Sequence, residues 1–285
     1  MKLVIAEKKS VATSIAQALC AAPVQKDGWF ECGRLLVTWA QGHLIELAMP
    51  EDYKERDWGK WSLDTLPVDP SGHWRWKISE ERGAGNRYRQ IVRLIRRADV
   101  DCLVNACDPD REGEAIFRRI ADMEGSRKPE QRLWAASLEA EAIQAAWRAM
   151  KPESEYRGLA WSAEIRSKAD WLIGMNASRA YSLLYNGRFS VGRVQTPTLA
   201  MIAERDRQIR NHKPVPFWTV IADMGGWRLS SERIGSREEA MLLCGQTEHG
   251  RFRIESVSRK RVNDRPPRLY DLTGLQARWP VRSYR

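Results

Sequence analysis

The segment that decides how this chain folds is Asp101-Cys102-Leu103-Val104-Asn105-Ala106-Cys107-Asp108-Pro109-Asp110-Arg111-Glu112-Gly113. Its first half is apolar and predicts a buried strand, and its second half places three carboxylates at alternate positions directly after that strand. Carboxylates pack poorly, but their oxygens are the ligands that Mg²⁺ prefers, and one or two of them usually hold the ion together with phosphate and water. The segment therefore predicts a divalent-cation site at the end of a strand.

Working outward from this segment, the amino-terminal half of the chain alternates apolar strands with amphipathic helices. Met1–Ala6 and Leu35–Trp39 are predicted to be short buried strands. Helices are predicted at four places: after Ser10 as N-cap, over Arg87–Ala98, over Glu112–Met123, and after Ser137 as N-cap. This alternation predicts an α/β domain over residues 1–152, with a parallel-type sheet flanked by helices.

After residue 152 the pattern changes to long helical periodicity, which predicts a helical domain over residues 153–214. Thr196-Pro197 carries two helix-start signals, a hydroxyl N-cap and a proline in the first turn, and this helix is expected to end near Arg210. Trp218–Ile221 and Phe252–Ile254 are strand-like and predict the beginning of a β-rich domain over 215–276. Residues 277–285 are expected to be an aberrant or truncated tail.

The charge of the chain is strongly basic and unevenly distributed. It has 47 basic and 37 acidic side chains, a net charge of +10. Nine basic and three acidic residues lie in 166–213, and ten and three lie in 251–285, so the rest of the chain is slightly acidic. This distribution predicts a polyanion-binding surface in the second half. The alternative is that the surface arginines only increase solubility.

The five cysteines show no zinc-ligand spacing, because they form no Cys-x-x-Cys pair and have no histidines nearby. Cys102 and Cys107 lie in or beside an apolar strand and are expected to be small core residues. The sequence contains no signal peptide and no stretch of 18 apolar residues, so we expect no membrane association and a reducing, cytoplasmic environment.

The acidic segment and the first strand are expected to form one site. Glu7 follows the first strand and Asp108 follows a later one, and ligands of open α/β sheets gather beyond the carboxyl ends of the strands. Glu7, Asp108, Asp110 and Glu112 are the predicted Mg²⁺ ligands, with Glu7 also exchanging a proton and Lys8 reaching a phosphate. The alternative is that Asp110 only caps a helix with Glu112 in its first turn, which leaves Asp108 and Glu7 unexplained.

Two motifs resemble known families. Ile5-Ala6-Glu7-Lys8 with Asp108-Pro-Asp-Arg-Glu-Gly113 resembles the toprim domain, a metal-binding fold of topoisomerases, bacterial primases and some nucleases. Ser190-Val-Gly-Arg-Val-Gln-Thr-Pro197 resembles the DNA-binding signature of type IA topoisomerases, and it follows the toprim motif at the expected distance. Gly42-His43-Leu44 and Ala169-Asp170-Trp171 are similar to the topoisomerase III branch.

This resemblance implies single-stranded DNA as the partner, Mg²⁺ as the cofactor and a set of groove residues. The predicted DNA-binding residues are Trp61, Arg166, Trp171, Arg179, Arg188, Ser190, Val191, Gly192, Arg193, Val194, Gln195 and Thr196. Stacking of a base on an aromatic ring contributes roughly 1–3 kcal/mol and tolerates any sequence. The alternatives remain that each tryptophan is a core residue, and that Arg166 and Arg188 are solvated surface groups.

The resemblance also implies an isomerase that cuts and rejoins one DNA strand without ATP, through a tyrosine in a Tyr-Pro-Arg-Thr-like motif. Neither Tyr270 nor Tyr284 is followed by Pro-Arg. We therefore expect a truncated amino-terminal part of such an enzyme, inactive in cleavage by itself. A non-catalytic remnant that binds single strands is the second hypothesis. A toprim nuclease or primase is disfavoured by the 190–197 motif and by the missing zinc site.

Overall fold

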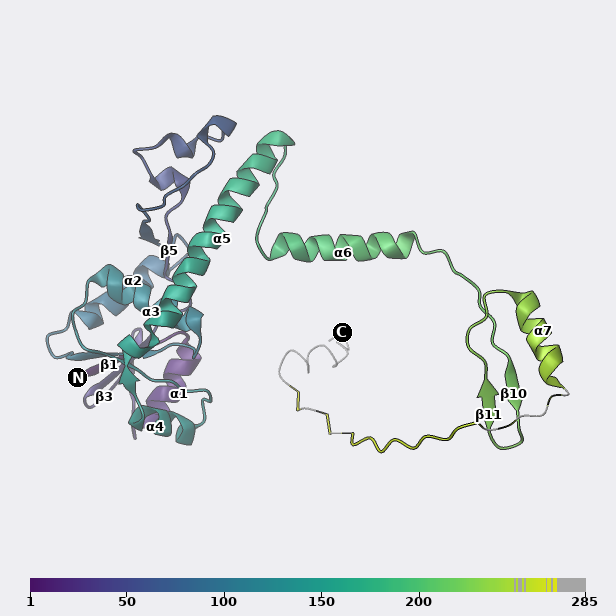
Figure 1. Ribbon diagram of the computed structural model, residues 1–285. Helices are drawn as coiled ribbons and strands as arrows, with labels where there is room; N and C mark the ends of the chain where they lie inside the picture. Colours follow the sequence, from purple (N-terminus) through teal and green to yellow (C-terminus); the bar gives the residue numbers. More distant parts are fainter. Residues whose placement is uncertain (249, 251–252, 254, 265, 268, 271–285) are drawn as a thin grey trace, which may run out of the picture. The chain divides into compact units, whose positions relative to one another are not determined.

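The computed structural model describes residues 1–248, 250, 253, 255–264, 266–267 and 269–270 (Figure 1). The chain divides into two compact units, residues 1–210 and residues 211–285. The tail at 277–285 and the strand expected at Phe252–Ile254 fall wholly or mainly outside the described residues.

The first unit is built on a seven-stranded mixed sheet. Its central strands run parallel in the order β4 (Leu35–Trp39), β1 (Lys2–Ala6), β7 (Cys102–Ala106) and β8 (Glu130–Arg132). The outer strands are antiparallel to their neighbours: β2 (Val24–Lys26), β3 (Trp29–Cys32) and β9 (Lys151–Pro152). The predicted α/β fold with a parallel core is therefore confirmed, and antiparallel strands extend it at both edges.

Helices cover both faces of this sheet, which explains why β1, β4 and β7 are buried along almost their whole length. Along β1, Leu3 and Ile5 face one core, which α2 (Ala84–Ile95) and α3 (Arg111–Glu124) complete. Val4 and Ala6 face the other core, which α1 (Lys9–Leu19) and α4 (Ala140–Arg148) complete. Cys102 and Cys107 are buried, as predicted.

Several helix boundaries differ from the prediction. Helix α1 begins at Lys9, so Lys8 and not Ser10 holds the N-cap position. Helix α4 has Glu139 at its N-cap, and Ser137 instead accepts the Glu139 amide in the preceding turn. Helix α2 begins at Ala84, three residues early, because Gly83 adopts φ +93° and sets the preceding turn.

The first unit also contains two long helices and an insertion of short elements. Helix α5 (Arg157–Leu184) follows the 3₁₀ turn η4 (Glu153–Tyr156) and packs along α3. Helix α6 (Gln195–Arg210) ends where predicted but begins one residue before Thr196, whose hydroxyl accepts the Gly192 amide. The insertion consists of β5 (Ile45–Leu47), η1 (Pro50–Asp52), η2 (Asp57–Gly59), η3 (Leu63–Thr65) and β6 (Trp76–Ile78).

The second unit contains the hairpin of β10 (Ile221–Asp223) and β11 (Arg228–Ser230), followed by α7 (Arg237–Glu248). The strand expected at Trp218–Ile221 is displaced, since only Ile221 enters β10 and Trp218 forms an isolated bridge with Ile234. None of the helices in the described part of the chain is both long enough and apolar enough to cross a membrane.

Two features of the first unit were not foreseen. Cys20 and Cys32 form a disulfide that joins the end of α1 to β3. Beneath the carboxyl end of β7 lies a buried polar network, in which Arg132 Nε is 2.5 Å from Glu114 Oε1. Asn105 Nδ2 donates to Glu114 and to Glu153, at 3.1 and 2.9 Å. Burial, followed by a hydrogen bond with Glu114, raises the pKa of Glu153 to about 9.

This raised pKa makes the stability of the first unit depend on pH. The folded chain keeps a proton on Glu153 that an unfolded carboxyl, with a pKa near 4.5, releases. The stabilisation is complete below that pH and is lost as the pH rises toward about 9. Between pH 5 and 8.5, Glu153→Gln should flatten the decline in the free energy of unfolding by at least about 1 kcal/mol.

Urea unfolding at a series of pH values, followed by circular dichroism, measures this difference. The matched control is Glu155→Gln, which lies on the same 3₁₀ turn but is half exposed and paired with Lys151. Identical pH profiles for the native chain and Glu153→Gln would show that Glu153 carries no proton in the folded state.

Candidate active site and nucleic-acid interface

The acidic edge of the first unit is formed by the ends of two neighbouring strands. Strands β1 and β7 pair in parallel with Ala6 opposite Ala106, so Glu7 and Asp108 emerge at the same edge. Lys8 Nζ lies 3.1 Å from Glu7 Oε1 and 3.2 Å from Asp108 Oδ2. Hydrogen bonds to Glu7 and then to Asp108 raise the pKa of Lys8. One ammonium therefore bridges the two carboxylates.

The turn after β7 is closed by a side-chain helix cap and by close backbone packing. Asp110 is the N-cap of α3, and its Oδ1 accepts the Gly113 amide at 2.8 Å. Asp110 thus caps the helix, and its role as a Mg²⁺ ligand stays a prediction. Gly113 is required sterically, because a Cβ there would lie 2.2 Å from the Asp108 carbonyl oxygen. The sequence showed this glycine only as part of a motif, without this packing role.

Glu112 contacts cationic side chains of the chain. Its Oε1 accepts from Arg166 Nη1 at 2.8 Å, and its Oε2 is 3.9 Å from His43 Nε2. Within the described ranges, no three His, Cys, Asp or Glu side chains are grouped so that they could hold a metal ion. The four predicted ligands therefore lie at one edge but are not gathered into one cluster.

A chain of alternating charges connects this edge to the 190–196 loop. Arg166 contacts Glu112 and also lies 3.5 Å from Asp170, one turn further along α5. Asp170 Oδ1 in turn accepts from Arg193 Nε at 2.5 Å. The hydrogen bond from Arg193 lowers the pKa of Asp170. The structure thus brings two predicted DNA-binding arginines, Arg166 and Arg193, into contact with one carboxylate beside the acidic edge.

The loop that carries Arg193 is fixed to α5 by small residues that the sequence reasoning missed. Ser178 Oγ accepts the Val191 amide at 2.9 Å, and Ser182 Oγ accepts the Phe189 amide at 3.0 Å. A Cβ at Gly174 would lie 3.5 Å from the Val191 carbonyl oxygen. The spacing of these small residues, four apart on one helix face, was the available signal.

The last part of the loop is ordered by Gln195. Its side-chain Nε2 donates a hydrogen bond to Ser190 Oγ at 2.8 Å. A Cβ at Gly192 would lie 2.9 Å from the Gln195 side chain, so this glycine makes room for Gln195. Val194 is exposed and lies between these contacts.

Two of the predicted groove residues, Arg179 and Trp171, are buried or half buried. Arg179 is only 1% exposed, and it bonds Glu51 at 2.7 Å and the Trp58 carbonyl. Its guanidinium lies 5.1 Å from the ring of Trp61, which is 53% exposed. Arg179 therefore packs against Trp61 from the interior. The prediction that Arg179 lies on the groove surface is wrong. Its buried position follows from the insertion, which folds back onto α5.

Trp171 is half buried and packs edge-to-face on Trp74, with ring centroids 5.4 Å apart. By contrast, Trp61, Arg188 and Ser190 come together in the lining of one cavity of about 710 Å³ at the carboxyl end of α5. Three predicted residues from two distant parts of the sequence therefore share one surface.

Family models match most of this chain. The toprim domain model matches residues 2–138, and a DNA topoisomerase model matches residues 154–280. A putative DNA topoisomerase 3 of Staphylococcus aureus strain bovine RF122 / ET3-1 and DNA topoisomerase 3 of strain MRSA252 are each 35% identical to it over 277 residues. These alignments cover 96% of this chain and 38% of each relative, so the chain spans well under half the length of these curated relatives.

A solved structure shares the fold. The structure of full-length topoisomerase I from Thermotoga maritima matches with a TM-score of 0.58 and 19% identity, covering 86% of this chain and 37% of that one. At this identity the match concerns the fold alone. The two family models and the relatives, together with the motifs at the acidic edge and at residues 190–197, show that this chain belongs to the type IA DNA topoisomerase family.

Proposed function

We propose that this chain supplies the metal-binding edge and the single-strand DNA groove of a type IA topoisomerase. Such an enzyme breaks one DNA strand, passes another through the gap and reseals it, with Mg²⁺ and without ATP, here in the cytoplasm. The observation that carries the proposal is the continuous contact from Glu112 through Arg166 and Asp170 to Arg193. It joins the acidic edge to the loop that is proposed to hold the strand.

The residues of this contact are suited to exchange partners with DNA. Arg193 and Arg166 are partly exposed cations whose present partners are carboxylates. A backbone phosphate offers the same paired oxygens, so the two guanidiniums can bind it in their place. The ammonium of Lys8, which now pairs with two carboxylates, can bind a phosphate in the same way. The half-exposed ring of Trp61 provides a face on which a base can stack.

The acidic edge fits Mg²⁺ by the chemistry of its donors. Glu7 and Asp108 both lie within about hydrogen-bonding distance of one ammonium, which shows that a cation can occupy the space between them. Glu7, Asp108, Asp110 and Glu112 are the proposed ligands, with phosphate and water completing the shell. When bound, the ion offsets negative charge on the phosphate. Glu7 is proposed to hold or release a proton near that phosphate.

The proposed nucleophile is a tyrosine in a Tyr-Pro-Arg-Thr-like motif, which residues 1–285 do not contain. We therefore propose that this chain by itself holds single-stranded DNA without cutting it. A second candidate function is that of a single-strand-binding protein without catalysis. It would use the same cationic contacts of Arg166 and Arg193, and the two functions differ in whether the bound strand is cut.

Binding to single-stranded DNA should depend on Arg193 and on salt. Arg193→Ala is expected to weaken binding of a fluorescein-labelled oligo(dT) about 10-fold at low salt, because it removes one phosphate contact. It should also make the slope of log K against log[salt] shallower by about 0.7. Fluorescence anisotropy over a salt series measures both values.

Arg34→Ala is the control, because Arg34 is an exposed arginine just before β4, at the opposite end of the parallel strands from the acidic edge. An Arg193→Ala chain that keeps the native affinity and slope would remove the loop from the binding surface.

Cleavage should be absent from this chain. With Mg²⁺ and a labelled single strand, we expect no covalent protein–DNA adduct on a denaturing gel and no relaxation of a supercoiled plasmid. The reason is that neither Tyr270 nor Tyr284 has the Pro-Arg that follows the nucleophile in the family. An adduct lost on Tyr270→Phe would assign the nucleophile to that residue and overturn the proposal of a missing tyrosine. Tyr88→Phe serves as control, because Tyr88 is buried in the core of the first unit.

A further inference from the structure

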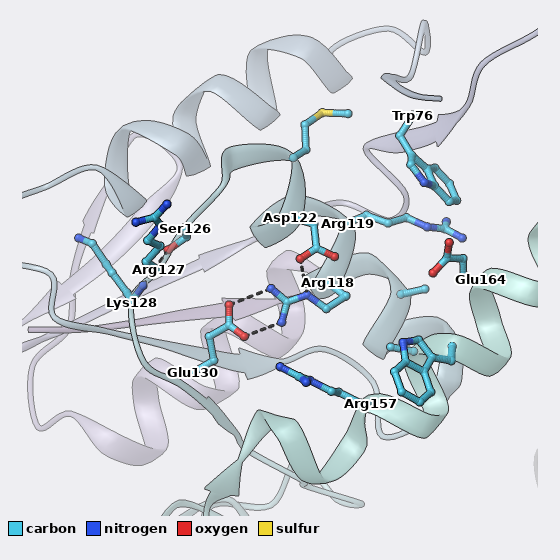
Figure 2. Close-up of a pocket in the computed structure, with 14 residues that line it drawn as sticks. Trp76, Arg118, Arg119, Asp122, Ser126, Arg127, Lys128, Glu130, Arg157 and Glu164 are labelled. Carbon is cyan, nitrogen blue, oxygen red and sulfur yellow. Dashed lines mark hydrogen bonds and ion pairs between the residues drawn. The ribbon is translucent and has the colours of Figure 1, made fainter. Parts of the chain in front are cut away.

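A second cavity, of about 690 Å³, lies between the carboxyl-terminal half of α3, the loop that follows it and the first turns of α5 (Figure 2). It shares no lining residue with the cavity beside Trp61, and it approaches the acidic edge only where Arg119 lies 3.2 Å from His43. Two tryptophans line it, Trp76 and Trp161. Five cationic side chains also line it, namely Arg118, Arg119, Arg127, Lys128 and Arg157.

The acidic residues of this lining already have partners. The carboxylate of Glu130 accepts hydrogen bonds from both terminal nitrogens of Arg118, at 2.5 and 2.9 Å, which Figure 2 marks with dashed lines. Asp122 accepts from the same guanidinium at 2.9 Å. Glu164 pairs with Lys168, one turn along α5. The carboxylates of the cavity are therefore engaged by two cations.

Four of the five cations form no ion pair with a carboxylate of the described residues. One of them, Lys128, donates instead to the carbonyl oxygens of Arg97 and Val100, at 2.9 and 2.6 Å. No carboxylate oxygen of the described residues lies within 4.0 Å of a guanidinium nitrogen of Arg119, Arg127 or Arg157, so none of the three forms an ion pair there. Arg119 instead stacks on Trp76 at 4.3 Å and donates to Ser167 Oγ at 2.7 Å. Burial lowers the pKa of Arg119, and the more distant charges of Glu112 and Glu164 offset only part of this effect.

Trp161 adds a free aromatic face to this positive surface. It is 62% exposed on α5, one turn after Arg157, although burial of an indole ring is strongly favourable. An anion alone would satisfy the arginines but would leave this ring in water. A nucleotide unit satisfies both, because its base stacks on an indole while its phosphate binds guanidinium groups.

We propose that this cavity is a second contact for single-stranded nucleic acid, with a base stacked on Trp161 and adjacent phosphates bound by Arg119, Arg127 and Arg157. The proposal rests on the proposed function and extends it. Arg157 and Arg166 are nine residues apart on α5, about 14 Å along the helix. At about 3.4 Å per stacked nucleotide, this distance corresponds to roughly four nucleotides. Nine residues also turn Arg157 to the opposite side of α5 from Arg166, so a strand held at Arg166 needs more than this number of nucleotides to reach the cavity.

The test compares oligo(dT) of 8 and 20 nucleotides by fluorescence anisotropy. Trp161→Ala/Arg157→Ala should weaken binding of the 20-mer about 10-fold and leave the 8-mer within about twofold, because the short strand is occupied by the groove. Trp161→Phe should retain most of the 20-mer affinity, since it keeps an aromatic face. The matched control is Trp227→Ala/Arg228→Ala, an exposed Trp–Arg pair in the second unit.

The outcomes separate this proposal from the proposed function. Loss confined to the 20-mer supports the second contact. Native 20-mer affinity in Trp161→Ala/Arg157→Ala, with binding still weakened by Arg193→Ala, overturns the second contact and keeps the groove. No binding of either strand by the native chain overturns both. If polyglutamate of matched charge displaces the 20-mer from the native chain more readily than from the double variant, the cavity binds acidic protein and the proposal is wrong.

Discussion

The buried ion pair between Arg132 and Glu114 fixes the acidic edge on which the other site contacts depend. Both side chains are at most 1% exposed, and they lie 2.5 Å apart. Arg132 also donates to the carbonyls of Cys107 and Asp108, at 2.8 and 2.7 Å. Removing one partner of a buried pair generally costs about 3–5 kcal/mol, because the other charge is left without compensation. The backbone that presents Asp108 is therefore anchored from inside the fold.

The same interaction explains how an acidic site persists at the surface of a basic protein. Arg132 and Glu114 neutralise each other, and the proton on Glu153 removes a further charge from the interior. Outside, Lys8 and Arg166 hold the exposed carboxylates in separate ion pairs. Such pairs contribute little to stability at partly exposed positions, so their cations can change partners at small cost. An edge built in this way is rigid in its backbone and adaptable in its side chains.

The sequence predicted the parts of this arrangement that follow from local pattern. The apolar runs before Glu7 and Asp108 predicted two buried strands, and parallel pairing brought their ends together. It did not predict that Glu112 turns to Arg166, because that depends on how α5 crosses α3. Arg179 was expected on the surface and is buried, since no local signal shows that residues 51–58 fold over it. The bond between Cys20 and Cys32 was missed for the same reason, as it depends on the packing of α1 against β3.

Helix α5 connects these contacts, and its changing neighbours explain its unusual sequence. Its 28 residues span about 42 Å, and its apolar residues follow no single stripe. A helix that packs on one neighbour needs one apolar face, whereas α5 has different neighbours along its length. Arg157 and Trp161 border the second cavity, Arg166 and Asp170 continue the acidic edge, and Gly174, Ser178 and Ser182 receive the loop before Arg193. Because one rigid helix carries all three sets, the spacing between them is fixed by its rise per residue. A strand that follows α5 would therefore meet each set at a defined distance from the acidic edge.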